Sequence, residues 1–195
     1  MATRVNVAWI RVAGAALLAL SAQVPSASAT EVPSAYDWAA GGEGVPPSLL
    51  FALALQESGL PWRGRLIPWP WTLNINGTPS RYANRWDACL ALRRALSRVP
   101  NANADVGLGQ INVHYYGERV REPCELLDPY RNLALTARIL REQHRPGEDW
   151  SLAVGRYHRP AGGPAAARYQ RSVEQRLIRL SQIPLTNPTT SASDP

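Results

Sequence analysis

The sequence predicts a mainly α-helical domain with a small hairpin or irregular insert. Apolar residues recur at helical spacing along most of the chain, and alternation is confined to one short segment before an Asn-Gly pair. The composition, 45% hydrophobic and 18% charged, is typical of a globular protein, and 195 residues suit one domain. Two cysteines are too few for a disulfide-dense miniprotein or a four-cysteine zinc site.

The first 29 residues have the pattern of a secretory signal. Two arginines lie near the N-terminus, residues 12–20 form a short apolar run, and Ala27-Ser28-Ala29 offers small residues for cleavage. The run is about half of the roughly 20 residues that a membrane-spanning helix needs. We therefore expect cleavage between Ala29 and Thr30, a periplasmic or exported chain, and no stable membrane anchor.

The mature domain is expected to span residues 30–181 and to begin with two helices. A short first helix stops at Gly41-Gly42. The second runs from Pro47 to Ser58, with proline in its first turn and Gly59 just past its end. Residues 49–55 are all apolar, which predicts a helix that passes through the core.

The middle of the chain is less regular. Residues 59–79 contain four prolines, and alternation over residues 72–75 before Asn76-Gly77 predicts a small hairpin. Helical spacing returns over residues 80–98, and a polar loop is expected over residues 100–105.

Three more helices are expected in the last third of the chain, over residues 128–144, 149–158 and 164–180. The first of them begins with an Asp-Pro pair, in which the aspartate can cap the helix. Residues 182–195 are rich in Thr, Ser, Asn and Pro, which predicts a disordered tail.

The net charge is positive, and every basic residue is an arginine. Without the signal, 19 basic residues remain against 15 acidic ones, a net charge of +4. The arginines are interleaved with acidic residues, which predicts a solvated basic surface and no nucleic-acid partner. An anionic polymer of the cell envelope is the neighbour that this charge would favour.

Cys89 and Cys124 are predicted to form a disulfide. An exported chain with an even cysteine count favours this pairing over two buried free thiols. The bridge would stabilise the fold by roughly 4 kcal/mol through the chain entropy of the unfolded state.

Acid–base chemistry by a carboxyl group is the remaining option for catalysis. The three histidines form no metal-binding pair, and the sequence has no glycine-rich phosphate loop and no nucleophile elbow, so no metal or cofactor is expected. Glu57 follows seven consecutive apolar residues and one glutamine, and a carboxyl held against apolar walls keeps its proton to higher pH. The alternative is a glutamate at a helix end that points into water.

Four segments, in order, resemble the soluble lytic transglycosylases of the goose-lysozyme-like superfamily, especially the small members attached to conjugation and secretion systems. They are Leu-Ala-Leu-Gln-Glu-Ser at 53–58, Gly-Leu-Gly-Gln-Ile-Asn at 107–112, Asp-Pro-Tyr-Arg-Asn-Leu from 128, and the helix from Trp150 to Tyr157. The resemblance covers about residues 45–160. It implies a lysozyme-like fold and peptidoglycan glycan strands as substrate, and suggests partners in a conjugative or secretion apparatus.

The resemblance also implies roles for individual residues. Glu57 would be the single catalytic acid and base. Ser58 would hold the substrate's acetamido group or fix the turn at the glutamate, and Gln110 and Asn112 would bind substrate. Tyr157 would line the cleft near Glu57, with its hydroxyl in reach of the glutamate or the substrate. A helix-end serine, a loop cap and a core tyrosine are the purely structural alternatives for Ser58, Gln110 and Tyr157.

One carboxyl suffices in the family's mechanism because the substrate supplies the nucleophiles. The glutamate protonates the oxygen between N-acetylmuramic acid and N-acetylglucosamine, and the acetamido oxygen stabilises the resulting cation. The ionised glutamate then takes the proton of the muramyl O6 hydroxyl, which closes on C1 to give a 1,6-anhydro product. Most glycosidases use two carboxyl groups instead.

The chain departs from the family pattern in three places. Gly109 stands where a methionine is common, and His158-Arg159-Pro160 replaces Asn-Ala-Gly. The interval from Glu57 to Gln110 is about twice the usual length and contains a tryptophan-rich insert. We expect Trp69 and Trp71, beside Trp62, to line the glycan cleft; the alternative is that they cover the core under a long loop.

Two other functions stay open. Asp105 could position a water molecule, which would make the protein a hydrolytic lysozyme. A non-catalytic peptidoglycan-binding scaffold is the other alternative, and the presence of Glu57, Gln110 and Tyr157 argues against it.

Overall fold

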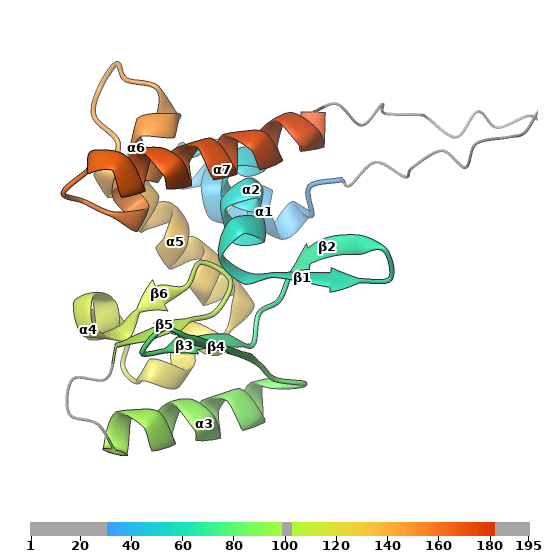
Figure 1. Cartoon of the computed structure of the whole chain (residues 1–195), viewed down its shortest axis with the longest axis vertical. Helices are drawn as coiled ribbons and strands as arrows, with labels where there is room; N and C mark the ends of the chain where they lie inside the picture. The colour runs from blue at the N-terminus through green and yellow to red at the C-terminus, as the bar shows by residue number, and fades with distance from the viewer. Residues whose placement is uncertain (1–30, 99–102, 182–195) are drawn as a thin grey trace, which may run out of the picture.

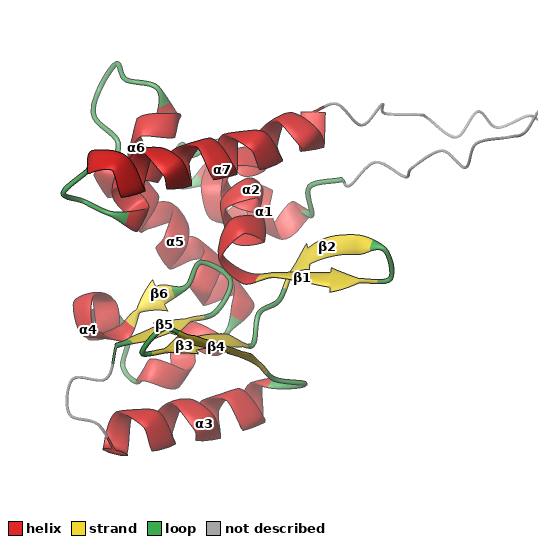
Figure 2. Cartoon of the chain, in the orientation of Figure 1, coloured by secondary structure: helices red, strands yellow, loops and turns green. Residues whose placement is uncertain are grey.

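The computed structural model describes residues 31–98 and 103–181 and is mainly α-helical (Figures 1 and 2). This confirms the predicted class. The predicted signal at 1–29 and the predicted tail at 182–195 lie outside the described residues. The helices are α1 (Ser34–Gly41), α2 (Pro47–Ser58), α3 (Arg85–Arg98), α4 (Val113–Tyr116), α5 (Pro129–Gln143), α6 (Trp150–His158) and α7 (Gly163–Ser181), with short 3₁₀ segments η1 (Gly117–Arg119) and η2 (Pro123–Leu127).

Helix α2 lies at the centre of the first of two hydrophobic clusters. Its residues 49–55 are all buried, as predicted, and helices α1, α5, α6 and α7 supply the residues packed around it. Its bounds agree with the sequence-based prediction because proline at its start and glycine past its end fix both limits locally.

In the described part of the chain, six short strands form two antiparallel sheets. Strands β1 (Gly59–Trp62) and β2 (Arg65–Pro68) make a hairpin directly after α2. Strands β3 (Thr72–Ile75), β4 (Thr78–Arg81), β5 (Ala104–Val106) and β6 (Ile111–Asn112) form a sheet in the order β4-β3-β5-β6. The predicted Asn-Gly hairpin is confirmed, since Asn76 and Gly77 both have positive φ and join β3 to β4.

Two element boundaries differ from the prediction by more than one residue. The helix expected from residue 80 begins at Arg85, because β4 continues to Arg81 and the Asn84 side chain accepts a hydrogen bond from the Asp87 amide at 2.9 Å, which caps the helix. The loop expected over residues 100–105 ends earlier, since Ala104 and Asp105 belong to β5 and pair with β3.

The second cluster lies between the sheet, α3, η2 and α5. A disulfide joins Cys89 on α3 to Cys124 on η2, with 2.01 Å between the sulfur atoms, which confirms the predicted pairing. Helix α5 contributes Leu133 and Leu140 to the first cluster and Ile139 to the second, and Tyr157 packs against both. Helix α5 therefore packs against both hydrophobic clusters and joins the two halves of the molecule that they form.

None of the described helices has the length and apolar character needed to cross a membrane.

Candidate active site

The loop of residues 107–110 is held by one residue from each of three helices. The Ser58 hydroxyl is 2.9 Å from the carbonyl oxygen of Leu108, the Tyr157 hydroxyl donates to the carbonyl oxygen of Gly109 at 2.7 Å, and Asn132 accepts from the Gly109 amide at 2.8 Å. Asn132 also donates to the carbonyl oxygens of Val106 and Leu126. The four sequence segments singled out above thus meet at one loop.

The two glycines of this loop are required by close packing. Gly107 has a φ of +81°, and a Cβ there would overlap the Asn132 side chain. A Cβ at Gly109 would overlap the Thr136 hydroxyl. Thr136 of α5 therefore leaves no room for a side chain at position 109, so a methionine would not fit there.

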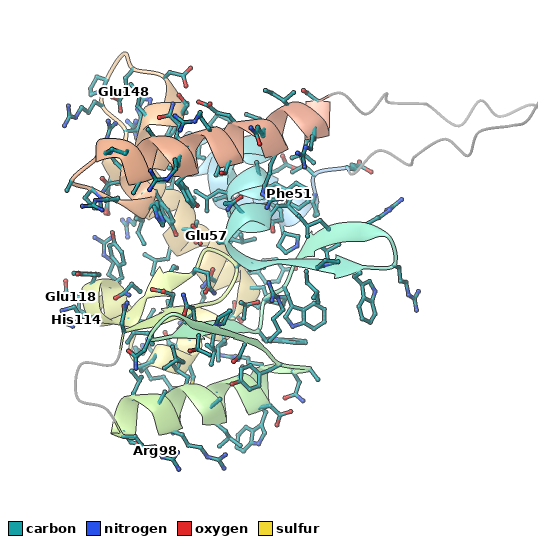
Figure 3. The ribbon with its side chains drawn as sticks, viewed as in Figure 1. Phe51, Glu57, Arg98, His114, Glu118 and Glu148 are labelled. Atoms are coloured by element: carbon teal, nitrogen blue, oxygen red, sulfur yellow. A yellow bond between two sulfur atoms is a disulfide. The ribbon has the colours of Figure 1, made fainter. Side chains whose placement is uncertain are left out.

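Glu57 lies in the last turn of α2, between the helical half and the sheet (Figure 3). Its side chain is partly buried, and its carboxylate accepts a hydrogen bond from the Tyr169 hydroxyl of α7. Burial raises the pKa of Glu57 to about 7, opposed by the Tyr169 hydrogen bond and assisted by the negative charge of Asp105. Near neutral pH the carboxyl can both hold and release a proton, as a general acid and base must.

Asp105 is the second carboxyl group close enough to act on Glu57. It lies on β5, where it is opposite Asn112 of β6, and the Asn112 amide donates to its carboxylate at 2.7 Å. Burial also raises the pKa of Asp105, while the Asn112 hydrogen bond and the charge of His158 lower it. The sheet thus places a second acidic group close enough for its charge to act on Glu57.

Tyr169 is the site residue that sequence reasoning missed. Its hydroxyl bonds Glu57 across 112 positions of sequence, and the His158 ring stacks on its ring at a centroid distance of 4.4 Å and an angle of 3°. The available signal was the spacing of Ala166, Tyr169 and Val173, a buried stripe on α7 that contains a tyrosine. That pattern indicates a core position but does not identify its partner.

Four of the predicted substrate-binding residues, Ser58, Gln110, Asn112 and Tyr157, support the loop or its neighbours. Ser58 is fully buried, so of its two predicted roles the geometry favours fixing the turn beside Glu57. The Gln110 side-chain amide donates to the carbonyl oxygens of Thr72 and Gly107, as the structural alternative of a loop cap predicts. The backbone of Gln110 has a positive φ. Asn112 caps α4 through the amides of His114 and Tyr115. Tyr157 bonds Gly109 while Tyr169 takes the place beside Glu57.

The tryptophans of the insert form an aromatic group beside the β1–β2 hairpin. Trp69 and Trp71 contact each other edge-on at 5.6 Å, and Trp62 lies 6.4 Å from Trp69. Trp69 and Trp71 are partly buried, Trp71 packs against the second cluster, and Trp69 donates to the Tyr82 carbonyl oxygen at 2.7 Å. Trp62 is the most open of the three, with half of its surface exposed.

Among the described residues, no group of three or more His, Cys, Asp or Glu side chains is arranged to hold a metal ion.

Comparison with protein-family models, with curated proteins and with solved structures finds no match to this chain. The structure itself describes a partly exposed carboxyl group of raised pKa, a tyrosine that donates a hydrogen bond to it and a second acidic residue whose charge acts on it. Such an arrangement can transfer a proton to and from a bound substrate.

Proposed function

We propose that the chain is a peptidoglycan lytic transglycosylase with a lysozyme-like fold that acts in the periplasm or after export. The observation that carries the proposal is the Glu57 carboxyl, whose pKa is raised to about 7 at the end of a buried helix. The meeting of the four family-like segments at the loop of residues 107–110 supports it.

The first step is proton transfer from Glu57 to the glycosidic oxygen between N-acetylmuramic acid and N-acetylglucosamine. The bond from muramyl C1 to that oxygen breaks, and N-acetylglucosamine leaves with a 4-hydroxyl group. The acetamido oxygen of the muramyl sugar stabilises the positive charge at C1. Glu57 is then ionised, and the Tyr169 hydroxyl stabilises the carboxylate by a charge-assisted hydrogen bond.

The second step returns the proton to Glu57. The carboxylate takes the proton of the muramyl O6 hydroxyl, and O6 forms a bond to C1 as the acetamido oxygen is released. The product is a 1,6-anhydro ring, and no water is consumed. Tyr169 favours the ionised form and burial favours the neutral one, so the two effects hold Glu57 near the midpoint that both steps need.

A hydrolytic lysozyme is the second candidate, and the position of Asp105 favours it. It lies on β5, close enough to Glu57 for its negative charge to raise the pKa of Glu57. A carboxylate there could direct a water molecule to C1. The product would then carry a reducing muramic end.

Mass spectrometry of the products released from purified peptidoglycan separates these candidates. The proposal expects anhydromuropeptides from the wild type and none from Glu57→Gln. Reducing-end products would assign the hydrolase and Asp105. Binding of peptidoglycan with no products from either protein would indicate the non-catalytic scaffold.

A role in local wall opening during assembly of a conjugation or secretion apparatus rests on the sequence resemblance alone. Loss of apparatus assembly in cells that carry Glu57→Gln would support this role, and normal assembly would contradict it.

A further inference from the structure

A polar pocket lies beside the candidate active site, between the end of α2 and the C-terminal half of α7. Its volume is about 270 Å³, and it is lined by Gln56, Ser172, Gln175, Arg176 and Arg179. Gln56 is the residue immediately before Glu57. The proposed mechanism uses none of the five residues that line this pocket.

The pocket carries two positive charges. Arg176 is partly buried, and its Nε donates to the Gln56 side-chain oxygen at 2.7 Å, which fixes the guanidinium against α2. Within residues 31–98 and 103–181, the ion pairs of the molecule include neither Arg176 nor Arg179. Burial and the neighbouring charge of Arg179 both lower the pKa of Arg176, as expected for two cations that share one site. An arginine fork of this kind matches a carboxylate.

The spacing on α7 between the pocket and the partner of Glu57 suits the peptide of peptidoglycan. Arg176 follows Tyr169, the partner of Glu57, by seven positions on α7, which corresponds to about 10 Å along the helix. An extended peptide covers that distance in about three residues. The stem peptide starts on the muramyl sugar, the sugar that Glu57 would cleave, and carries free carboxylates.

We propose that this pocket binds a carboxylate of the stem peptide, so that the protein selects glycan strands that still carry their peptides. The inference rests on the proposed function. Arg179 and Arg176 would hold the carboxylate, and Ser172 and Gln175 would supply further hydrogen bonds.

The test compares two substrates and two variants. The substrates are peptide-bearing glycan and the same glycan stripped of its peptides by an amidase. Arg179→Gln removes one pocket charge without touching Gln56, and Arg171→Gln is the matched control, because Arg171 is an exposed arginine of the same helix outside the pocket. The kcat/KM of each protein is measured on both substrates.

The inference expects the wild type to have a higher kcat/KM on peptide-bearing glycan than on stripped glycan. On peptide-bearing glycan, the kcat/KM of Arg179→Gln should be about tenfold lower than that of the wild type, the effect of losing one partly exposed charge-assisted hydrogen bond. On stripped glycan, the kcat/KM of Arg179→Gln should fall no more than that of Arg171→Gln. Equal wild-type rates on the two substrates, or equal losses by the two variants on peptide-bearing glycan, would overturn it.

A binding measurement keeps the inference separate from the proposed function. The isolated stem peptide and inorganic phosphate are each titrated into Glu57→Gln and into the Glu57→Gln/Arg179→Gln double variant. Peptide binding that weakens about tenfold in the double variant supports the pocket even if no glycan is cleaved. No peptide binding, or phosphate binding as tight as that of the peptide, contradicts the assignment.

Discussion

The pKa of Glu57 depends on two opposing effects of its surroundings. Burial favours the neutral carboxyl, and the Tyr169 hydroxyl favours the carboxylate. The two effects act in opposite directions on one group, so each can be removed and measured separately.

Tyr169→Phe removes the hydrogen bond that stabilises the carboxylate. The pKa of Glu57 should rise, so the loss of activity with increasing pH should move to higher pH, and the maximal rate should fall about tenfold because the ionised form is less stable. The pH profile of wall cleavage measures both effects. Tyr157→Phe is the control, since its hydroxyl bonds Gly109 instead. An unshifted profile in Tyr169→Phe would show that Tyr169 only packs.

Glu57 should also make stability depend on pH. Its folded-state pKa of about 7 lies above its ordinary value of 4.5, so the folded protein binds the proton more tightly than the unfolded chain, and stability is lost as the pH rises through 7. Between pH 5 and 8, the free energy of unfolding of the wild type should fall by roughly 1–3 kcal/mol more than that of Glu57→Gln. Urea unfolding at both pH values measures the difference. Parallel pH dependence of the two proteins would mean that Glu57 is not desolvated.

At the scale of elements, the loop of residues 107–110 depends on Asn132. One buried side chain satisfies an amide and two carbonyl oxygens from three separate segments. Leaving such groups buried without partners is costly.

Asn132→Ala should therefore destabilise the fold by about 3 kcal/mol or more. Asn84→Ala, which removes an exposed cap of α3, should cost only about 1 kcal/mol. Thermal unfolding of the two variants gives the comparison. Equal losses would show that the loop finds other partners.

The helices whose limits are set locally could be predicted from the sequence. Helix α2 has its proline and glycine, and α5 and α6 have the aspartate caps Asp128 and Asp149. Strands β1, β2, β5 and β6 could not be predicted, because each has two to four residues and is defined by its pairing partner. The prolines in β1 and β2 also argue against strands in the sequence.

The candidate site was predictable only in part for a similar reason. Glu57 follows an apolar helix, a local pattern that sequence shows directly. Tyr169 contacts it from 112 positions away, and no spacing rule connects them. Gln110 and Asn112 are polar residues of a loop, and sequence does not distinguish a loop support from a substrate ligand.

For the whole molecule, the two hydrophobic clusters meet along α5 and at Tyr157, and Glu57 lies at the end of the helix nearest their boundary. The disulfide lies in the second cluster, where it joins α3 to η2. It therefore supports the sheet that carries Asp105 without contacting Glu57.

Removal of the disulfide should lower stability without removing the site. The Cys89→Ser/Cys124→Ser variant should lose about 4 kcal/mol, since the bridge closes a loop of 35 residues. Urea unfolding measures the loss, and wall cleavage assayed well below the melting temperature should persist. Full stability in the variant would mean that the bridge does little to restrict the unfolded chain. Loss of cleavage by a folded variant would mean that it shapes the site.

Digestion of peptidoglycan in ¹⁸O-labelled water tests the central claim most directly, because the claim is that O6 of the sugar, and not water, attacks C1. The account predicts anhydro products that contain no ¹⁸O and that are absent with Glu57→Gln. Products that carry one ¹⁸O at C1 would contradict it and assign the reaction to water directed by Asp105.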